Sequence, residues 1–247
     1  MSGAVRLQHL GKPEKYWDNA GQVSYAQAMY ASVDVERHIR TRLWNISLEI
    51  ADCIGIPSNG HVLDYGCGDG AFANEILSKK YSAVDGYDLA PAAIARAVAE
   101  APGSHMKFVA ADLLKIDHTA LPKYDGVFLI GILHHIKQAT PSILRALAQA
   151  SGKAVVLEPN GNNLVRKLLE YTPSYRAAGE DSFYTNELIR VFENSGWRVI
   201  VSRRLNLFPN FTPRTVFRLL APLESRIEAS KLWNALCTVN MFGIGRQ

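Results

Sequence analysis

Short apolar runs alternate with helical stretches between His61 and Val201, and this alternation constrains the fold more than any other feature of the sequence. Consecutive strands that are separated by helices run parallel, because a crossover must return the chain to the same end of the sheet. The pattern therefore predicts an α/β fold with a doubly wound, mostly parallel, Rossmann-like sheet. The expected strands are His61–Tyr65, Ala83–Tyr87, Lys107–Ala110, Gly126–Ile130, Ala154–Leu157 and Arg198–Val201, and the expected helices are Ala71–Lys79, Pro91–Glu100, Pro141–Ala150 and Asn186–Asn194.

Two further stretches flank this core. Apolar residues recur at spacings of three and four from Ser24 to about Cys53, which predicts a long amphipathic helix that the turn at Gly55–Gly60 ends. In the last stretch a helix is expected to about Trp233, and the apolar run Leu236–Ile244 is expected to add a seventh strand at the edge of the sheet. The predicted organisation is an N-terminal helical lid (1–56), a ligand-binding core (57–204), and a helical insertion with the final edge strand (205–247).

The composition limits the possible partners. Of the 247 residues, 48% are hydrophobic and 20% charged, which is typical of an ordinary globular protein. No apolar run reaches the roughly 18 residues of a membrane span, and the formal charge of +4 is small and scattered, so neither a membrane span nor nucleic acid is expected. Cys53, Cys67 and Cys237 are too few and too far apart for a disulfide framework, which favours a cytoplasmic location.

The sharpest local signal is the glycine-rich segment Val62–Gly70, an apolar strand that ends in an acidic residue and is followed by alternate glycines. A dinucleotide site would have the spacing Gly-x-Gly-x-x-Gly, which places a pyrophosphate on the next helix. Here the third glycine, Gly70, comes one residue early. Asp64 and Asp69 also place two carboxylates beside the loop, which would repel a pyrophosphate but suit an ammonium group. The loop therefore favours a cationic ligand over a phosphorylated one.

This segment resembles the first motif of the class I S-adenosylmethionine-dependent methyltransferases, an acidic residue followed by Gly-x-Gly-x-Gly. The resemblance covers about Ser58 to Val201. It implies S-adenosylmethionine as the cofactor, and it implies methyl transfer as the activity. In that family the glycines allow the backbone to approach the methionine part of the cofactor.

The resemblance also implies a set of cofactor-binding residues. Asp88 ends the second expected strand, where the family has an acidic residue that accepts both ribose hydroxyls. Asp85 is the alternative, but it lies within the strand and is expected to face outward. Asp112 and Leu113 match the family's adenine pair, one accepting from the exocyclic amine and one packing on the ring. The implied cofactor-binding residues are Asp64, Gly66, Cys67, Gly68, Asp88, Leu89, Asp112, Leu113, Ile130 and Gly131.

Candidate catalytic residues follow the fourth and fifth expected strands. Methyl transfer from a sulfonium needs alignment of the acceptor and no metal, and we expect none here; a hydroxyl acceptor gains from a base. Adjacent side chains are expected to face apart, so His134 is the candidate base and His135 is expected to pack under the following helix. Glu158 ends the neighbouring strand, where a carboxylate would orient the imidazole. The alternative is that these side chains only cap and pack.

The acceptor is expected to be a small molecule methylated at oxygen, and the polar segment Asn160–Phe183 slightly favours sugar or glycan-precursor hydroxyls. Methylation of a small amine or an RNA nucleoside is the first alternative, and a non-catalytic cofactor-binding subunit is the second. Aromatic residues before the sheet are expected either in a lid over the cofactor, which the resemblance implies, or in the packing of the helices. The insertion Phe208–Trp233 is expected to form a second lid wall, a homodimer surface or a membrane-facing helix. The aromatic residues before the sheet that this expectation concerns are Tyr16, Trp17, Tyr25 and Tyr30.

Overall fold

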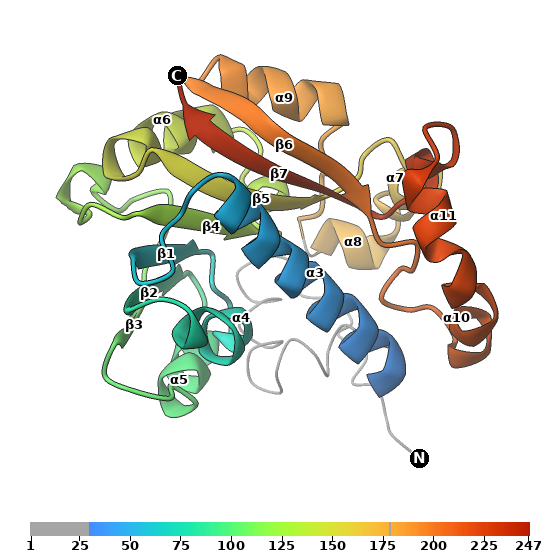
Figure 1. Cartoon of the computed structure of the whole chain (residues 1–247), viewed down its shortest axis with the longest axis horizontal. Helices are drawn as coiled ribbons and strands as arrows, with labels where there is room; N and C mark the ends of the chain where they lie inside the picture. The colour runs from blue at the N-terminus through green and yellow to red at the C-terminus, as the bar shows by residue number, and fades with distance from the viewer. Residues whose placement is uncertain (1–29, 178) are drawn as a thin grey trace.

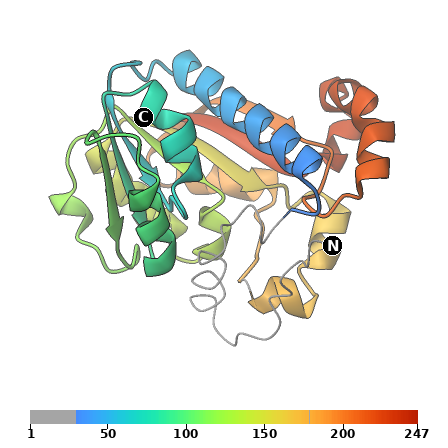
Figure 2. The ribbon, with the colours of Figure 1, turned by 90° about the horizontal axis from the view of Figure 1, so that it is seen from below.

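The computed structural model describes residues 30–177 and 179–247, and it contains a seven-stranded sheet with helices on both faces (Figures 1 and 2). The strand order is β3-β2-β1-β4-β5-β7-β6. All neighbours from β3 to β5 are parallel, which confirms the predicted doubly wound architecture. The strands are β1 (His61–Tyr65), β2 (Ala83–Asp88), β3 (Met106–Ala110), β4 (Gly126–Ile130), β5 (Lys153–Pro159), β6 (Trp197–Leu205) and β7 (Val239–Arg246).

The last strand is not at the edge, so that part of the prediction is wrong. β7 lies between β5 and β6 and is antiparallel to both. Both of its backbone edges are hydrogen-bonded, and six consecutive residues from Asn240 to Gly245 are buried. In β6 only the two end residues are buried, and the residues between them alternate at first between exposed and half-buried. A continuous apolar run is typical of an interior strand and alternation of an edge strand. The edge position therefore belongs to β6.

The helices cover the two faces of the sheet and bury two separate cores. Alternate residues of each strand enter opposite cores, so that Val62 packs with the α3 side and Leu63 with the α6 and α9 side. α3 crosses one face of the sheet (Figures 1 and 2). The main helices are α3 (Val33–Cys53), α4 (Ala71–Glu75), α5 (Pro91–Ala99), α6 (Thr140–Ala150), α7 (Leu164–Leu169), α8 (Pro173–Ala177), α9 (Thr185–Glu193), α10 (Arg214–Leu220) and α11 (Glu224–Ala229), and the short 3-10 turns are η1 (Leu77–Lys79), η2 (His118–Ala120), η3 (Leu133–His135), η4 (Ala221–Leu223) and η5 (Trp233–Leu236).

Two helices differ from the sequence prediction. α3 begins at Val33, later than expected within the described residues, because the Ser32 hydroxyl accepts the backbone N–H of Val35 and caps the helix. The predicted helix up to Trp233 is divided into α10, η4, α11 and η5. Three of the predicted lid residues lie outside the described residues, namely Tyr16, Trp17 and Tyr25.

Buried carboxylates attach the C-terminal insertion to α3. Glu224 lies 2.7 Å from the His38 ring and accepts the backbone N–H of Leu207, and Glu228 accepts from Arg42 and from the backbone N–H of Asn206. The insertion is thereby fixed beside the N-terminal half of α3, where Figure 1 shows α10 and α11. No helix among residues 30–177 and 179–247 is long and apolar enough to cross a membrane.

Replacing Arg42 with alanine is expected to destabilise the protein by about 2–4 kcal/mol, because Glu224 and Glu228 would lose the cation that balances two nearly buried charges. Chemical denaturation monitored by circular dichroism measures the loss. Arg203→Ala is the control, since Arg203 and Glu49 form an exposed pair that contributes little. Equal losses in the two variants would contradict this account of the insertion.

Candidate active site

The glycine loop after β1 has the backbone conformation that its glycines predict. Gly66 has φ +84° and Gly70 has φ +75°, values that other residues adopt only with strain. A Cβ on Gly66 would lie 2.6 Å from Ile132 Cγ1, and one on Gly70 would lie 2.5 Å from Ala97 Cβ. The third glycine, Gly70, thus allows α4 and α5 to pack closely. Asp64 and the loop that follows it line a cavity.

Asp64, at the end of β1, is a buried carboxyl that faces this cavity. Its Oδ2 atom has no hydrogen-bond partner among the described residues. Burial, together with the charge of Asp88, raises the pKa of Asp64 to about 8. A buried carboxylate without donors is costly unless a cation or a donor group satisfies it. The position therefore suits a cationic ligand group.

Asp88 ends β2 beside the loop. One of its oxygens accepts the backbone N–H of Gly68 at 2.8 Å, and the other accepts that of Ala90 at 2.9 Å. Burial raises the pKa of Asp88, and these backbone donors oppose the rise. The carboxylate is thus held at the cavity wall with lone pairs left for a ligand.

Asp85 does not face outward as predicted. Its side chain is buried and accepts a hydrogen bond of 2.9 Å from the hydroxyl of Tyr124. The hydroxyl reaches Asp85 from the segment just before β4 and provides the donor that a buried carboxyl needs. Asp85 is not among the described residues that line the cavity, so the position of Asp88 is favoured over that of Asp85.

Asp112 and Leu113 follow β3 and border the same cavity. Asp112 accepts the backbone N–H of Leu114 at 3.0 Å and lies 2.7 Å from Lys115 Nζ. The hydrogen bond from Lys115 keeps the pKa of Asp112 below its ordinary value, so this side chain is a carboxylate at neutral pH. Leu113 is buried, and its carbonyl accepts from the Tyr65 hydroxyl, which fixes the turn.

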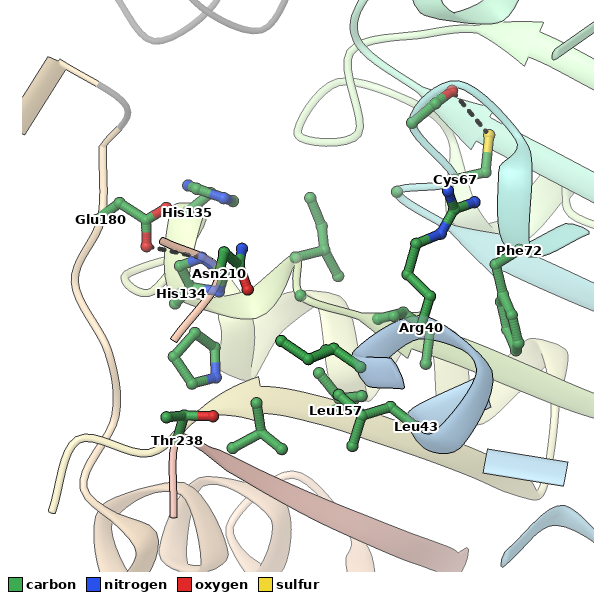
Figure 3. Close-up of a pocket in the computed structure, with 18 of the residues that line it drawn as sticks. Arg40, Leu43, Cys67, Phe72, His134, His135, Leu157, Glu180, Asn210 and Thr238 are labelled. Atoms are coloured by element: carbon green, nitrogen blue, oxygen red, sulfur yellow. Dashed lines mark hydrogen bonds and ion pairs between the residues drawn. The ribbon is translucent and has the colours of Figure 1, made fainter. Parts of the chain in front are cut away.

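His134 lies at the other side of the cavity, where Figure 3 shows it beside Glu180. A second carboxylate, that of Glu158, contacts the same ring. Its Nδ1 is 2.7 Å from Glu158 Oε2, and its Nε2 is 3.2 Å from Glu180 Oε2. Burial alone would lower the pKa of His134, but the charges of Glu158 and Glu180 raise it to about 9. Glu158 also accepts the backbone N–H groups of Leu133 and His134, so it fixes both the backbone and the ring. In this state the ring is an imidazolium at neutral pH.

His135 does not pack under the following helix, and the two rings do not face apart. Their centroids are 3.9 Å apart, and both side chains line the cavity. The reason is the local backbone, because Leu133–His135 forms a 3-10 turn instead of an extended segment. Burial, together with the charge of His134, lowers the pKa of His135 to about 3, so this ring is neutral.

The same cluster includes the one described donor set that could hold a metal ion. Ligand atoms of His134, His135 and Glu180 lie within 4.8 Å of one another, and imidazole with carboxylate suits divalent transition metals. The Glu180 oxygen that faces His134 also pairs with the Arg166 guanidinium. A guanidinium at that position repels a metal cation. The arrangement therefore favours an ion-pair network, and the absence of a metal requirement stays a prediction.

One cavity of about 650 Å3 brings most of the predicted residues together. All ten predicted cofactor residues and His134 line it, whereas Glu158 lies behind His134 and is fully buried. Their roles stay predictions. Tyr30 lines the cavity and packs against the core, and burial raises the pKa of its hydroxyl to about 12; the lid stays a prediction.

Sequence reasoning did not find several lining residues. Arg40 and Trp44 belong to α3, and Asn210 and Thr238 belong to the C-terminal insertion. Glu180, in the loop after α8, lies in the polar segment Asn160–Phe183, to which the sequence assigned no single role. Figure 3 shows Arg40 and Cys67 on one side of the cavity and the His134 cluster on the other. The available signal for Arg40 was its position directly after Ile39, a residue of the apolar face of the first helix. For Asn210 and Thr238 the sequence offered no comparable signal.

Comparison with known proteins was made for sequence and for structure. The model of a family described as a methyltransferase domain matches residues 36–202. No curated protein matches the sequence significantly.

Similar solved structures extend over nearly the whole chain. An S-adenosylmethionine-dependent methyltransferase from Mesorhizobium loti is 18% identical with a TM-score of 0.60, and it covers 82% of this chain and 97% of its own. The magnesium protoporphyrin IX methyltransferase of Synechocystis with bound SAH is 14% identical with a TM-score of 0.62. The match covers 95% of this chain and 98% of that protein's chain. The [4+2]-cyclase SpnF is 12% identical with a TM-score of 0.65, covering 94% of each chain. At these identities the likeness concerns the fold alone.

Proposed function

The chain belongs to this methyltransferase domain family, and we propose that it, as an S-adenosylmethionine-dependent methyltransferase, methylates a hydroxyl group of a small molecule, of the sugar or glycan-precursor class. The observation that carries the proposal is the position of His134. Its buried ring lies across the cavity from the glycine loop and is oriented by Glu158. An imidazole held by a carboxylate is suited to accept the proton of a hydroxyl acceptor.

The cavity residues fit S-adenosylmethionine. The unpartnered Oδ2 of Asp64 is suited to the cofactor's ammonium group, Asp88 to the two ribose hydroxyls, and Asp112 to the adenine amine. Leu113 and Leu89 provide apolar surface beside the adenosine, and the Ile130 and Gly131 backbone borders the same region. When bound, the cofactor supplies an electrophilic methyl group on a sulfonium leaving group, so alignment and exclusion of water remain for the protein.

The acceptor side of the cavity supports a polyhydroxylated substrate. Arg166, Tyr175 and Asn210 line the cavity with polar side chains. The Asn163 amide also lines it, but it donates to the Leu236 carbonyl and accepts the backbone N–H of Arg166, so it serves the fold. These groups come from α7, α8 and the insertion, whereas Ile39 and Leu43 of α3 contribute apolar lining. A hydroxyl-rich acceptor can exchange hydrogen bonds with such polar groups, which a purely apolar acceptor cannot.

Asp64→Asn is expected to weaken cofactor binding by about 10- to 100-fold while stabilising the free protein. The charge-assisted hydrogen bond to the ammonium is lost, and so is a carboxyl that is costly to bury. In the wild-type protein, affinity should rise as the pH increases through about 8, because the ammonium is best bound by the ionised carboxyl. Calorimetry between pH 6 and 9 and thermal unfolding of both proteins measure these effects. An unchanged affinity in the variant would remove Asp64 from the cofactor site.

The proposed function is tested in two steps. Calorimetry should show binding of S-adenosylhomocysteine and none of NAD; the reverse result would contradict the cofactor assignment. Incubation with methyl-labelled S-adenosylmethionine and a panel of neutral sugars, small amines and nucleosides, followed by mass spectrometry, then identifies the acceptor class. Methylation of amines alone would favour the N-methyltransferase alternative. Cofactor binding without turnover, together with capture of a protein partner, would favour the non-catalytic subunit.

A further inference from the structure

Glu180 contacts the His134 ring nitrogen that would have to accept the proton if His134 acts as a general base. Its Oε2 lies 3.2 Å from His134 Nε2, while Nδ1 of the same ring is 2.7 Å from Glu158. Glu180 follows α8, in a segment far from η3 in the sequence, and its side chain is 12% exposed and lines the cavity. With both nitrogens bonded to carboxylates, the ring carries two protons and has no lone pair for an acceptor hydroxyl.

The groups that face His134 explain why this state is stable. Glu158 approaches from β5 and Glu180 from the loop after α8, and both are acidic. His135 lies beside the ring and is neutral, and Arg166 of α7 pairs with the same Glu180 oxygen that faces His134. Carboxylates and cations thus alternate in one network, Glu158, His134, Glu180 and Arg166, and Glu170 also pairs with Arg166. Such a network is stable while all of its members are paired. Removing one member leaves its neighbours as buried, unpaired charges, which destabilises the fold.

We propose that Glu180 gates the base: it keeps His134 protonated in the free enzyme, and the acceptor hydroxyl must take its place at Nε2 before methyl transfer. This inference rests on the proposed function. Glu180 is a positioning residue that acts through His134, and its contact with Arg166 gives it a second partner to hold it when it leaves the ring.

The proton transfers balance in this scheme. When Glu180 leaves Nε2, the proton of that nitrogen passes to solvent, and Nδ1 keeps its own proton toward Glu158. The acceptor O–H proton then passes to Nε2 while its oxygen forms the bond to the methyl carbon. The carbon–sulfur bond of the sulfonium breaks, and its electron pair stays on sulfur. The products are the methyl ether, S-adenosylhomocysteine and an imidazolium ring.

The displaced carboxylate indicates the class of acceptor. Glu180 is nearly buried, so once it has lost the His134 N–H it needs another donor besides Arg166. A second hydroxyl next to the methylated one would provide this donor, because Arg166 keeps Glu180 beside the site after it has left Nε2. The site therefore favours an acceptor with two adjacent hydroxyls over a monohydroxy analogue.

Nuclear magnetic resonance of histidine-labelled protein with bound S-adenosylhomocysteine tests the gate without an acceptor. In the wild-type protein His134 should titrate near pH 9, and in Glu180→Gln its titration should move at least about one pH unit lower, because one anionic partner is lost. Glu170→Gln is the matched control, since Glu170 also pairs with Arg166 in the same segment but does not contact His134. An unshifted titration in folded Glu180→Gln would overturn the proposal.

Kinetics with a hydroxyl acceptor test the consequence. The pH limb of kcat/KM should move lower in Glu180→Gln in parallel with the His134 titration, and preference for a diol over its monodeoxy analogue should fall by about tenfold or more. A uniform loss of kcat with an unmoved limb would mean a structural role and would overturn the gate. If neither the wild-type protein nor any variant methylates a hydroxyl compound, the proposed function is refuted, and so is the acceptor part of this inference. The His134 titration would still decide whether Glu180 keeps His134 protonated. Inhibition of the wild-type enzyme by a chelator, restored by Zn2+, would overturn the proposal in favour of a metal at the same three residues.

Discussion

Replacing His134 with alanine is expected to lower turnover by about 10²- to 10⁴-fold, which is the usual contribution of a general base, while leaving cofactor affinity unchanged. The reason is that His134 faces the cavity across from the residues proposed to hold the cofactor. Turnover of an identified hydroxyl acceptor and calorimetry with S-adenosylhomocysteine measure the two quantities. Near-normal turnover would mean that the acceptor is an amine or is already ionised and needs alignment alone.

Alanine at this position would also leave Glu158 and Glu180 without their shared cation, so His134→Gln is the second variant. A glutamine amide can donate to a carboxylate but cannot accept the proton at neutral pH. His135→Ala is the comparison for loss of a ring in the same cavity wall. If His134→Gln folds like the wild-type protein and is equally active, the base assignment is wrong.

The pH dependence has a definite sign. Because the pKa of His134 is raised to about 9, the rate should increase with pH toward that value, and Glu158→Gln should move the limb to lower pH. The same raised pKa means that the ion-pair network stabilises the fold fully below the ordinary histidine pKa of 6.5, and that this contribution is lost as the pH rises through about 9. Unfolding free energies measured between pH 6 and 10 check the second statement.

Asp88→Ala is expected to weaken cofactor binding by about 10²- to 10⁴-fold, since two charge-assisted hydrogen bonds to the ribose, each on the order of 1.5–3 kcal/mol, would be lost. The variant also loses the bonds to the backbone of Gly68 and Ala90, which loosens the glycine loop. Calorimetry with S-adenosylhomocysteine measures the affinity, and circular dichroism monitors the fold.

Asp85→Asn is the control for the ribose assignment. The Asp85 side chain accepts a hydrogen bond from Tyr124 and does not line the cavity. The variant should therefore keep the cofactor affinity of the wild-type protein. Wild-type affinity in a folded Asp88→Ala protein would show that Asp88 does not hold the ribose. A large loss in Asp85→Asn alone would reverse the assignment of the two residues.

Local sequence patterns were sufficient for the core of the fold. The ends of β1 and β4 agree with the prediction, because a short apolar strand is bounded by turn residues that are visible in the sequence. The glycine loop was equally predictable, since its spacing depends on backbone conformations that few other residues adopt. The position of β7 was not, because a strand's neighbours depend on pairing between distant segments and not on its own composition.

The sequence by itself determined the doubly wound sheet, the loop with Asp64, and the likeness to S-adenosylmethionine-dependent methyltransferases, since each is encoded by neighbouring residues. Only the tertiary structure decided the state of His134. Its protonation depends on Glu158 from another strand and on Glu180 from a distant loop, which meet the ring inside a buried cavity. Charge interactions there act over a few ångströms in a low dielectric, and sequence spacing carries no information on which distant charges come that close.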